Sequence, residues 1–364
     1  MSLPLTAPPR HLCLLRLSAI GDTCHVVPLL RSLQQAWPQC RFTWVIGQLE
    51  ARLMRLIDGV EFITVDKRAG WRALAALRRE LRGREFDVLL HLQLALRASL
   101  VAAQIPARVK LGFDRARARE LHWLFTDAQI APREREHVLD SFLGFAHALG
   151  VPAGPPRWDV PLPREARAYA ERLAAAAAPR GLLIISACSS HPRRNWLPER
   201  YAAVATHAIR RHGLQVILTG GPGAHERTMA DQIIAACSEP LVDTVGRDTL
   251  PELLALLERA TALVTPDSGP AHMATMVGTP VIGLYAATNP ERSGPYLSRQ
   301  WCVNAYDRAA RRYRGKPAAA LPWTEKIEEP GVMALIEVDE VTAKLDELLA
   351  SGAATRPRPA PTED

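Results

Sequence analysis

The chain has 364 residues, 48% of them hydrophobic, which is enough for two cores and excludes wholesale disorder. Its net charge of +7 favours anionic partners such as phosphates, nucleic acid or an acidic membrane surface. However, only five of the 45 basic residues are lysines, and GC-rich coding produces such an excess of arginine without any function. Because it contains no run of 18 apolar residues, no secretory signal and no C-x-x-C pair, we expect a cytoplasmic protein without a membrane span, zinc site or disulfide scaffold.

The first half alternates short apolar runs with amphipathic segments. Residues 11–17 are almost continuously apolar, which predicts a buried parallel strand. A helix follows from about His25 and ends before Pro38. The alternation continues through predicted strands at 42–46, 61–65 and 86–92 and predicted helices at 49–57 and 71–81. This rhythm predicts a doubly wound parallel sheet.

Residues 108–137 break the rhythm, because they are rich in arginine and weakly periodic, and we expect them to be dominated by loops. A predicted helix at 138–149 closes the first unit. Five prolines between residues 152 and 163 predict a semi-rigid connector. We therefore place the first domain at residues 1–160.

The β-α alternation restarts beyond the connector. The second half contains predicted strands at 181–186, 214–219, 241–245 and 281–285, predicted helices at 164–178, 198–212, 224–236 and 250–259, and an apolar run that ends at Pro266. We expect a second domain at 161–335, a C-terminal helix at 336–350 and a disordered tail at 351–364.

Each half has a polar turn after its first strand, at the edge of the sheet where open α/β folds bind ligands. In the first half this turn contains Gly21 and Asp22. A partly desolvated carboxylate at this place could act as a general base on a hydroxyl. Alternatively, Asp22 only caps the helix that begins near Thr23.

In the second half the corresponding turn carries Ser189, Ser190, Arg193 and Arg194 within six residues. Serine hydroxyls donate hydrogen bonds and guanidinium groups fork onto phosphate oxygens, so this grouping suits a diphosphate. The alternative is a solvated loop in which Trp196 packs at the start of the next helix. That alternative accounts for Trp196 but not for the serines and arginines.

A second polar turn in this half, Asp267-Ser268-Gly269-Pro270-Ala271-His272, separates a strand-like run from a new helix. Asp267 or Ser268 can cap that helix, and Gly269 lets a ligand approach the backbone. The first-turn amides and the helix dipole suit a phosphate, and His272 could reach a phosphate or a ribose. An ordinary capped turn with a structural histidine is the alternative.

Several common nucleotide-binding patterns are missing. The glycine turn at 220–223 is not followed by the G-K-[ST] of a Walker loop, and the first strand is not followed by G-x-G-x-x-G, which argues against a dinucleotide dehydrogenase. No Asp-x-Asp pair exists to hold a divalent cation against phosphate. If a diphosphate leaves here, arginines and amides must stabilise it, so we expect neither a metal nor a cofactor.

Five motifs in order resemble glycosyltransferase family 9, the ADP-heptose:lipopolysaccharide heptosyltransferases, over nearly the whole chain. They are Arg16-Leu17-Ser18-Ala19-Ile20-Gly21-Asp22, Phe86-Asp87-Val88 with Leu92-Gln93, Ser189-Ser190 with Arg194-Asn195-Trp196, Gly220-Gly221-Pro222, and Asp267 to His272 with Leu284 to Pro290. The resemblance implies a GT-B architecture, in which two Rossmann-like, doubly wound parallel-sheet domains face a cleft. The first would bind the acceptor and the second the nucleotide-sugar, and the helix at 336–350 would pack back on the first domain.

The resemblance also implies roles for individual residues. Asp22 matches the proposed general base of an inverting, metal-independent transfer. The expected donor-binding residues are Ser189, Ser190, Arg194, Glu226, Asp267, Ser268, Gly269, Pro270 and His272. The expected acceptor-binding residues are Gly21, Gln93, Arg97, Arg115 and Arg119. Two departures concern Arg194, where the family commonly has lysine, and the segment before the last helix, where Arg311 to Lys316 and Pro322-Trp323 replace cysteines of some members.

We therefore predict a cytoplasmic enzyme that moves a heptose from ADP-heptose to a lipopolysaccharide inner-core acceptor, in peripheral contact with the inner membrane. Arg115, Arg117 and Arg119 could hold acceptor phosphates or carboxylates, although general arginine enrichment explains them equally well. The alternatives are transfer of another sugar to a different glycan acceptor and a non-catalytic nucleotide-sugar-binding protein. Nucleic acid is disfavoured as a partner, because no arginine–aromatic repeat suggests base stacking.

Overall fold

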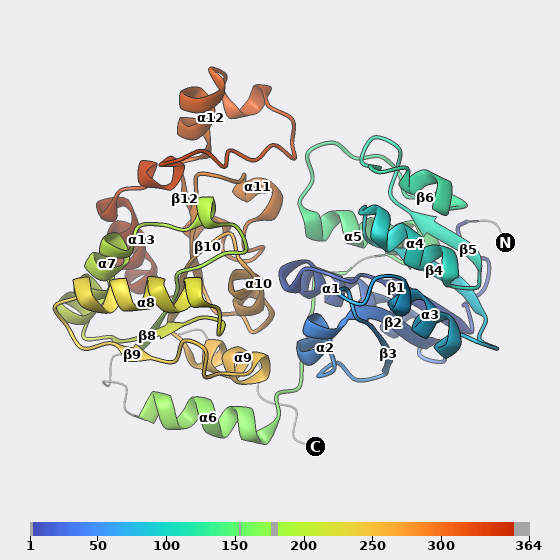
Figure 1. Cartoon of the computed structure of the whole chain (residues 1–364), viewed down its shortest axis with the longest axis horizontal. Helices are drawn as coiled ribbons and strands as arrows, with labels where there is room; N and C mark the ends of the chain where they lie inside the picture. Colours follow the sequence, from blue (N-terminus) through green and yellow to red (C-terminus); the bar gives the residue numbers. More distant parts are fainter. Residues whose placement is uncertain (1–2, 153, 176–180, 353–364) are drawn as a thin grey trace. The chain divides into compact units, whose positions relative to one another are not determined.

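The computed structural model describes residues 3–152, 154–175 and 181–352, and the chain divides into two units, Met1–Asp159 and Val160–Asp364. Each unit is built on a six-stranded sheet in which every pair of neighbouring strands is parallel (Figure 1). The predicted α/β class with two doubly wound parallel sheets is confirmed.

The first unit has the strand order β3-β2-β1-β4-β5-β6. Its strands are β1 His11–Leu15, β2 Arg41–Gly47, β3 Val60–Val65, β4 Phe86–His91, β5 Ala107–Gly112 and β6 Ala128–Gln129, and its helices are α1 Ile20–Ala36, α2 Gln48–Met54, α3 Trp71–Glu80, α4 Leu96–Gln104 and α5 Val138–Leu149. The winding reverses between β1 and β4, so the residues that follow these two strands meet at the carboxyl edge of the sheet.

Two sequence predictions for this unit are wrong. The helix expected from about His25 begins at Ile20, so that Asp22 lies in its first turn. The loop expected over 108–137 begins only after β5, and α4 just before β5 was not predicted. The side chains of β5 alternate between buried and partly exposed, so this strand lacks the continuous apolar run that marks the central strands.

Trp158 anchors the proline-rich connector to the first unit. Its side chain is buried, and its indole Nε1 donates a hydrogen bond to the carbonyl of Cys24 at 2.9 Å. The guanidinium of Arg31 on α1 donates to the carbonyl of Trp158 at 3.2 Å. The first half of the connector therefore belongs to the first unit.

The second unit repeats the topology, with the strand order β12-β11-β10-β7-β8-β9 and the reversal between β7 and β10. Its strands are β7 Leu182–Ser186, β8 Gln215–Thr219, β9 Val242–Asp243, β10 Ala262–Pro266, β11 Val281–Tyr285 and β12 Val303–Asn304, and its helices are α6 Arg164–Ala175, α7 Pro198–His212, α8 Ala224–Ala236, α9 Leu250–Arg259, α10 Gly269–Met276, α11 Pro290–Ser293, α12 Tyr306–Arg314 and α13 Val338–Ala350.

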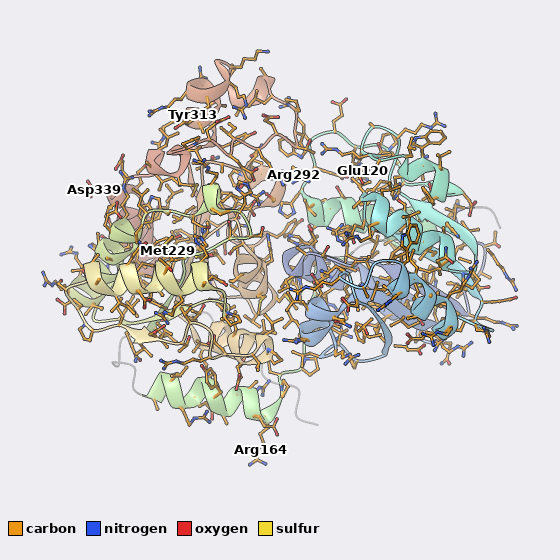
Figure 2. The ribbon with its side chains drawn as sticks, viewed as in Figure 1. Glu120, Arg164, Met229, Arg292, Tyr313 and Asp339 are labelled. Atoms are coloured by element: carbon orange, nitrogen blue, oxygen red, sulfur yellow. The ribbon has the colours of Figure 1, made fainter. Side chains whose placement is uncertain are left out.

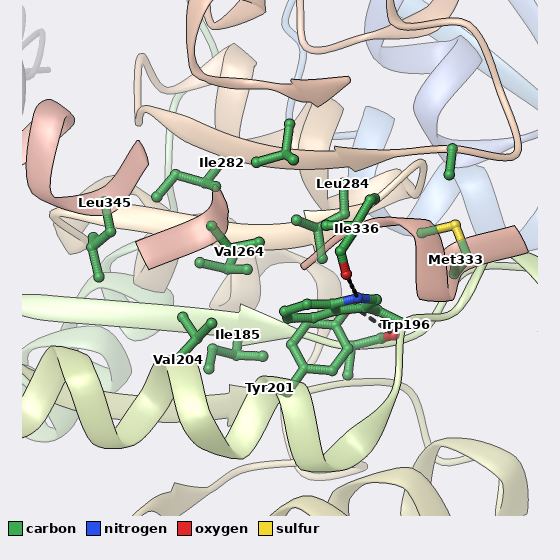
Figure 3. Packing of buried hydrophobic residues seen from close by; sticks show 14 of the residues in the cluster. Ile185, Trp196, Tyr201, Val204, Val264, Ile282, Leu284, Met333, Ile336 and Leu345 are labelled. Atoms are coloured by element: carbon green, nitrogen blue, oxygen red, sulfur yellow. Dashed lines mark hydrogen bonds between the residues drawn. The ribbon is translucent and has the colours of Figure 1, made fainter. Parts of the chain in front are cut away.

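Trp196 organises the core of the second unit. The side chain is 1% exposed, and its Nε1 donates to the carbonyl of Ile336 at 3.0 Å (Figure 3). Its ring meets that of Tyr201 edge to face, with centroids 5.1 Å apart. These contacts fasten the loop after β7 to the segment that precedes α13.

The C-terminal helix α13 packs within the second unit, beside α7 (Figure 1). Its apolar side chains Val341, Leu345 and Leu348 are fully buried in that core. The sequence-based expectation put this helix on the first domain. Its apolar stripe completes the second core, and a contact of this helix with the first domain stays a prediction. The predicted tail lies outside the described residues beyond Gly352.

Candidate functional site

Asp22 lies at the carboxyl edge of the first sheet, in the first turn of α1. Its Oδ2 pairs with Nη2 of Arg16, the residue that follows β1, and also accepts a hydrogen bond from the backbone N–H of Ala19 at 3.4 Å. Its Oδ1 makes no hydrogen bond with the described residues, and the side chain is 35% exposed. Asp22 therefore braces the start of the helix with one oxygen and keeps the other available.

Arg16 ties the turn to the neighbouring elements. Its guanidinium is 13% exposed, donates from Nη1 to the carbonyl of Leu92 at 2.5 Å and lies 5.5 Å from the ring centre of Phe142 on α5. The side chain thus joins the ends of β1 and β4 to Asp22. Sequence reasoning placed Arg16 in a motif but assigned it no role.

Gln93, expected to contact the acceptor, supports the same turn from the loop after β4. Its Oε1 accepts a hydrogen bond from the backbone N–H of Leu17 at 2.7 Å, and its Nε2 donates to Ser18 Oγ at 3.3 Å. Gly21, another expected acceptor residue, is buried inside this turn. Both residues shape the backbone that presents Asp22, and their contact with an acceptor stays a prediction.

An ion pair between α2 and the loop after β3 supports the turn, and sequence reasoning missed it. Glu50 is 3% exposed, and its carboxylate pairs with Nζ of Lys67 at 2.8 Å. The same ammonium lies 3.4 Å from the carbonyl of Leu17. A Cβ at Gly47 would lie 2.3 Å from both Leu17 O and Glu50 Oε2, so this close packing requires a glycine.

The expected acceptor arginines divide into two groups. Arg97, Arg115 and Arg119 are exposed at the carboxyl edge of the first sheet. Arg117, in the turn at residues 115–117, is turned inward, where it pairs with Asp114 and Glu136. Arg117 therefore supports this loop through two carboxylates, and its suggested contact with acceptor phosphates stays a prediction.

In the second unit, the turn after β7 is folded by its own side chains. Asn195 Oδ1 accepts from the backbone N–H of Ser189 at 2.7 Å, and Ser189 Oγ donates to the carbonyl of His191 at 3.0 Å. Ser190 is exposed. Of the two expected hydroxyls, that of Ser189 is engaged in the turn, whereas that of Ser190 faces solvent.

Arg194 projects from this turn as half of an ion pair that the sequence did not reveal. Its Nε and Nη2 both donate to Glu328 Oε1, at 2.8 and 2.6 Å, and its Nη1 lies 4.0 Å from Asp267 Oδ2. Burial tends to raise the pKa of Glu328, but the hydrogen bond and charge of Arg194 outweigh it and lower that pKa. Glu328 is therefore charged near neutral pH.

Two further cations belong to this cluster. Lys326 is exposed as a residue, yet desolvation of its ammonium group and the Arg194 cation lower its pKa, and Arg292 on α11 (labelled in Figure 2) adds to this repulsion. We name Arg194, Arg292 and Lys326 the cation cluster. Glu328 and Lys326 come from the segment between α12 and α13, which carries no recognisable motif, so sequence reasoning could not find them.

The turn from Asp267 to His272 follows β10, the strand beside β7. Ser268 is the N-cap residue of α10, but no side-chain oxygen caps this helix, because Ser268 Oγ lies 2.8 Å from Thr265 Oγ1 instead. The predicted capping by Asp267 or Ser268 is therefore wrong. Gly269 and Pro270 begin the helix, so its first-turn amides suit an anion. His272, in the same turn, is 7% exposed.

Glu226, expected to contact a ribose, lies in the first turn of α8. Its Oε1 accepts from the backbone N–H of Gly221 at 2.7 Å and so shapes the glycine turn after β8. The neighbouring His225 lies 2.7 Å from Asn195 Nδ2, which links this turn to the one after β7. The contact of Glu226 with a ribose stays a prediction.

Comparison with known proteins identifies the family. The model of glycosyltransferase family 9 (heptosyltransferase) matches residues 74–323. The chain is 38% identical over 343 residues to the lipopolysaccharide core heptosyltransferase OpsX of Haemophilus influenzae, a match that covers 94% of this chain and 98% of that protein.

Solved structures show the same fold. A family 9 glycosyl transferase from Veillonella parvula has a TM-score of 0.76 at 22% identity, covering 94% of this chain and 97% of that one. The E. coli heptosyltransferase WaaC with ADP has a TM-score of 0.71 at 21% identity, covering 93% and 99%. The predicted GT-B fold is therefore confirmed, and the chain belongs to glycosyltransferase family 9 and is a glycosyltransferase.

Proposed function

We propose that this enzyme transfers a heptose from ADP-heptose to a sugar of a lipopolysaccharide inner core. The family and the activity named for the Haemophilus relative support this substrate class, and the E. coli structure named with ADP supports an adenine nucleotide donor. One observation carries the proposal: the carboxyl edge of the first sheet presents a carboxylate with an available oxygen, and that of the second presents the cation cluster, with Glu328 and Asp267 beside Arg194.

On the donor side, the diphosphate would bind between the cation cluster and the first turn of α10. Arg194 is already oriented by Glu328, so its side chain loses less conformational entropy when it binds a phosphate. Ser190 and the amides after Ser268 would donate to the remaining phosphate oxygens. Glu226 and His272 would contact the nucleoside side of the donor.

In the proposed inverting reaction, Oδ1 of Asp22 takes the proton of an acceptor hydroxyl. The hydroxyl oxygen attacks the anomeric carbon from the face opposite the diphosphate, and the bond between that carbon and the phosphate oxygen breaks. The electron pair leaves with ADP, and the proton stays on Asp22 until solvent removes it. Arg16 keeps Oδ2 occupied, so that Oδ1 is the oxygen that accepts the proton.

The negative charge that develops on the leaving diphosphate would be stabilised by Arg194, Arg292 and Lys326. Fixed cations and backbone amides can perform the role that a divalent ion performs in other sugar transfers. We therefore propose a metal-independent reaction, which predicts that turnover persists in excess chelator.

None of the described helices combines the length and apolarity required to cross a bilayer. Because inner-core acceptors are linked to lipid, we propose that the enzyme works in the cytoplasm at the surface of the inner membrane.

The decisive experiment incubates the purified enzyme with ADP-heptose and a heptose-deficient core acceptor. We expect ADP release that depends on the acceptor, an acceptor heavier by one heptose, and inversion at the anomeric carbon by NMR. Turnover with another nucleotide-sugar but not with ADP-heptose would replace the proposed donor. Binding of ADP-heptose without turnover on any core acceptor would instead support a non-catalytic nucleotide-sugar-binding protein.

A further inference from the structure

Large apolar side chains are exposed together in the first unit. Among the described residues, those with the greatest exposure there are Leu49, Trp71, Leu96, Leu121, Trp123 and Leu124, with exposed fractions between 40 and 78%. Each follows the carboxyl end of a strand, namely β2, β3, β4 or β5. They therefore gather at the same sheet edge as Asp22, and not at random over the surface.

Two hydrogen bonds join the segments that carry most of these side chains. The backbone N–H of Leu96 donates to Glu120 Oε2 at 2.5 Å, which places the start of α4 against the loop after β5 (Glu120 is labelled in Figure 2). Arg97 Nη1 donates to the carbonyl of Lys67 at 3.1 Å, which places it against the loop after β3. We name the joined segments 66–72, 93–97 and 113–125 the edge surface.

The edge surface is basic as well as apolar. Its three segments contain seven basic residues but only three acidic ones. Two of the acidic residues accept hydrogen bonds from backbone amides, and Asp114 is paired with Arg117. The exposed arginines of the surface are Arg68, Arg72, Arg97, Arg115 and Arg119. Most of the positive charge of the edge surface is therefore carried by exposed side chains.

Arginine and tryptophan are also in direct contact on this surface. The guanidinium carbon of Arg115 lies 5.0 Å from the ring centre of Trp123. A stacked arginine can bind a phosphate with its edge while the aromatic ring beneath it enters an apolar layer. Tryptophan, leucine and arginine in this combination are typical of proteins that lie at the interface between water and a bilayer.

We infer that the edge surface docks the enzyme on an anionic lipid leaflet, so that the lipid-linked acceptor reaches Asp22 without leaving the membrane. The inference rests on the proposed acceptor class and adds to it the surface by which the enzyme meets that acceptor. Charge complementarity selects the partner: arginines pair with lipid phosphates, and Trp71, Leu121 and Leu124 enter the headgroup region.

Flotation with two kinds of vesicle tests the inference. We expect the full chain to bind vesicles of phosphatidylcholine with phosphatidylglycerol, to bind phosphatidylcholine alone at least about tenfold more weakly, and to release as salt rises. The double variant Trp71→Ser, Leu124→Ser should lose binding by about tenfold or more, because the apolar insertion is removed. Arg68→Gln with Arg72→Gln should lose about fivefold per charge.

The second unit offers a matched control, Ile234→Ser with Leu297→Ser, since these side chains are 39 and 50% exposed and do not belong to the segments of the edge surface. This control should bind vesicles like the unchanged chain. Equal binding by the control and by Trp71→Ser, Leu124→Ser would overturn the inference. So would sedimentation showing that the apolar side chains mediate a dimer that the double variant abolishes.

The outcome can be separated from that of the proposed function. On a soluble, lipid-free core acceptor, Trp71→Ser, Leu124→Ser should retain the turnover of the unchanged enzyme, whereas on vesicle-embedded acceptor its rate should fall in step with binding. Absence of heptose transfer to either acceptor by the unchanged enzyme would contradict the proposed function and leave vesicle binding as a separate result.

Discussion

Arg16 and Asp22 form an ion pair in which the guanidinium holds Oδ2 of the carboxylate and leaves Oδ1 without a hydrogen bond among the described residues. The pair joins the end of β1 to the first turn of α1, at the point where the winding of the first sheet reverses. A carboxylate that is fixed through one oxygen loses little freedom when its other oxygen accepts a proton. This geometry suits a general base better than a free surface aspartate does.

Replacement of Asp22 by Asn should remove the base and keep the shape of the turn. We expect kcat to fall by about 10²–10⁴, with the dissociation constant for ADP unchanged, because the proposed nucleotide site belongs to the second unit. Single-turnover kinetics and calorimetry measure the two quantities. Asp66→Asn, which alters another carboxylate of the first unit, is the control, and a normal kcat in Asp22→Asn would remove the assignment.

The kinetics of a Gln93 variant distinguish whether this residue supports the turn or contacts the acceptor. Because both polar atoms of its amide are bound to Leu17 and Ser18, Gln93→Leu should loosen the turn that carries Asp22. We expect kcat to fall by about tenfold, equivalent to about 1.4 kcal/mol, with little change in the KM for acceptor. A rise in that KM at constant kcat would instead identify Gln93 as an acceptor contact.

Arg194 and Glu328 should change donor affinity in opposite directions. Arg194→Gln should weaken ADP binding by about ten- to a hundredfold, because a charge-assisted contact with the diphosphate is lost. Glu328→Gln should strengthen it by about threefold, because a carboxylate that competes for Arg194 and repels phosphate becomes neutral. Calorimetric titration with ADP measures both, and Arg194→Lys should lie between Arg194→Gln and the unchanged chain. Weaker ADP binding by Glu328→Gln would contradict this prediction, because it would show that the orientation of Arg194 by Glu328 matters more than the repulsion between Glu328 and the phosphate.

Asp248, in the turn before α9, predicts a pH dependence of stability. Burial raises the pKa of this carboxyl to about 6, and hydrogen bonds from Thr244 and its own backbone offset only part of that effect. The unfolded chain loses this proton near pH 4 and the folded chain only near pH 6, so the free energy of unfolding falls as pH rises through that window.

Asp248→Asn should remove the fall in unfolding free energy between pH 4 and pH 6. It should therefore raise the free energy of unfolding at pH 8 by about 1–2 kcal/mol, with allowance for the partial exposure of the side chain. Urea titrations at pH 8 and pH 4 check the prediction. The same variant at pH 4 is its own control, because most of the difference should be lost there, close to the pKa of the unfolded carboxyl. An equal gain in unfolding free energy at pH 8 and pH 4 would mean that the substitution acts through packing and not through ionisation of Asp248.

Trp158 should make a measurable contribution to the first unit. Trp158→Phe keeps most of the buried ring but removes the hydrogen bond to the carbonyl of Cys24, which should cost about 1–2 kcal/mol of unfolding free energy. Trp71→Phe is the matched control, since Trp71 is 78% exposed and should change stability by less than about 0.5 kcal/mol. Equal effects in urea unfolding would contradict the anchoring role of Trp158.

Prediction from sequence succeeded where local pattern and final environment agree. The central strands are buried on both faces and read as continuous apolar runs, and helices such as α5 and α7 carry an apolar stripe at helical spacing. It failed at β5 and α4, which lie toward the arginine-rich side of the first sheet and have partly exposed side chains. It also missed α12, whose sequence is dominated by charge.

The site residues divide in the same way. Asp22, Arg194 and the turn from Asp267 to His272 lie in short local motifs directly after strands, so their spacing alone pointed to them. Glu328, 134 residues from Arg194, is found only once the chain has folded. The inward orientation of Arg117 likewise depends on Asp114 and Glu136, which no local pattern marks as its partners.

The sequence by itself determined the α/β class, the two doubly wound halves and the polar turns at the strand ends, because hydrophobic periodicity and turn chemistry act over a few residues. Only the tertiary structure decided which oxygen of Asp22 is held, which arginines face solvent, and which core receives the last helix. Those choices follow from contacts that local preferences leave open, because burial and charge pairing select one arrangement: Arg16 is held by Leu92, 76 residues away, Arg117 pairs with Glu136, 19 residues away, and the last helix packs in the second core.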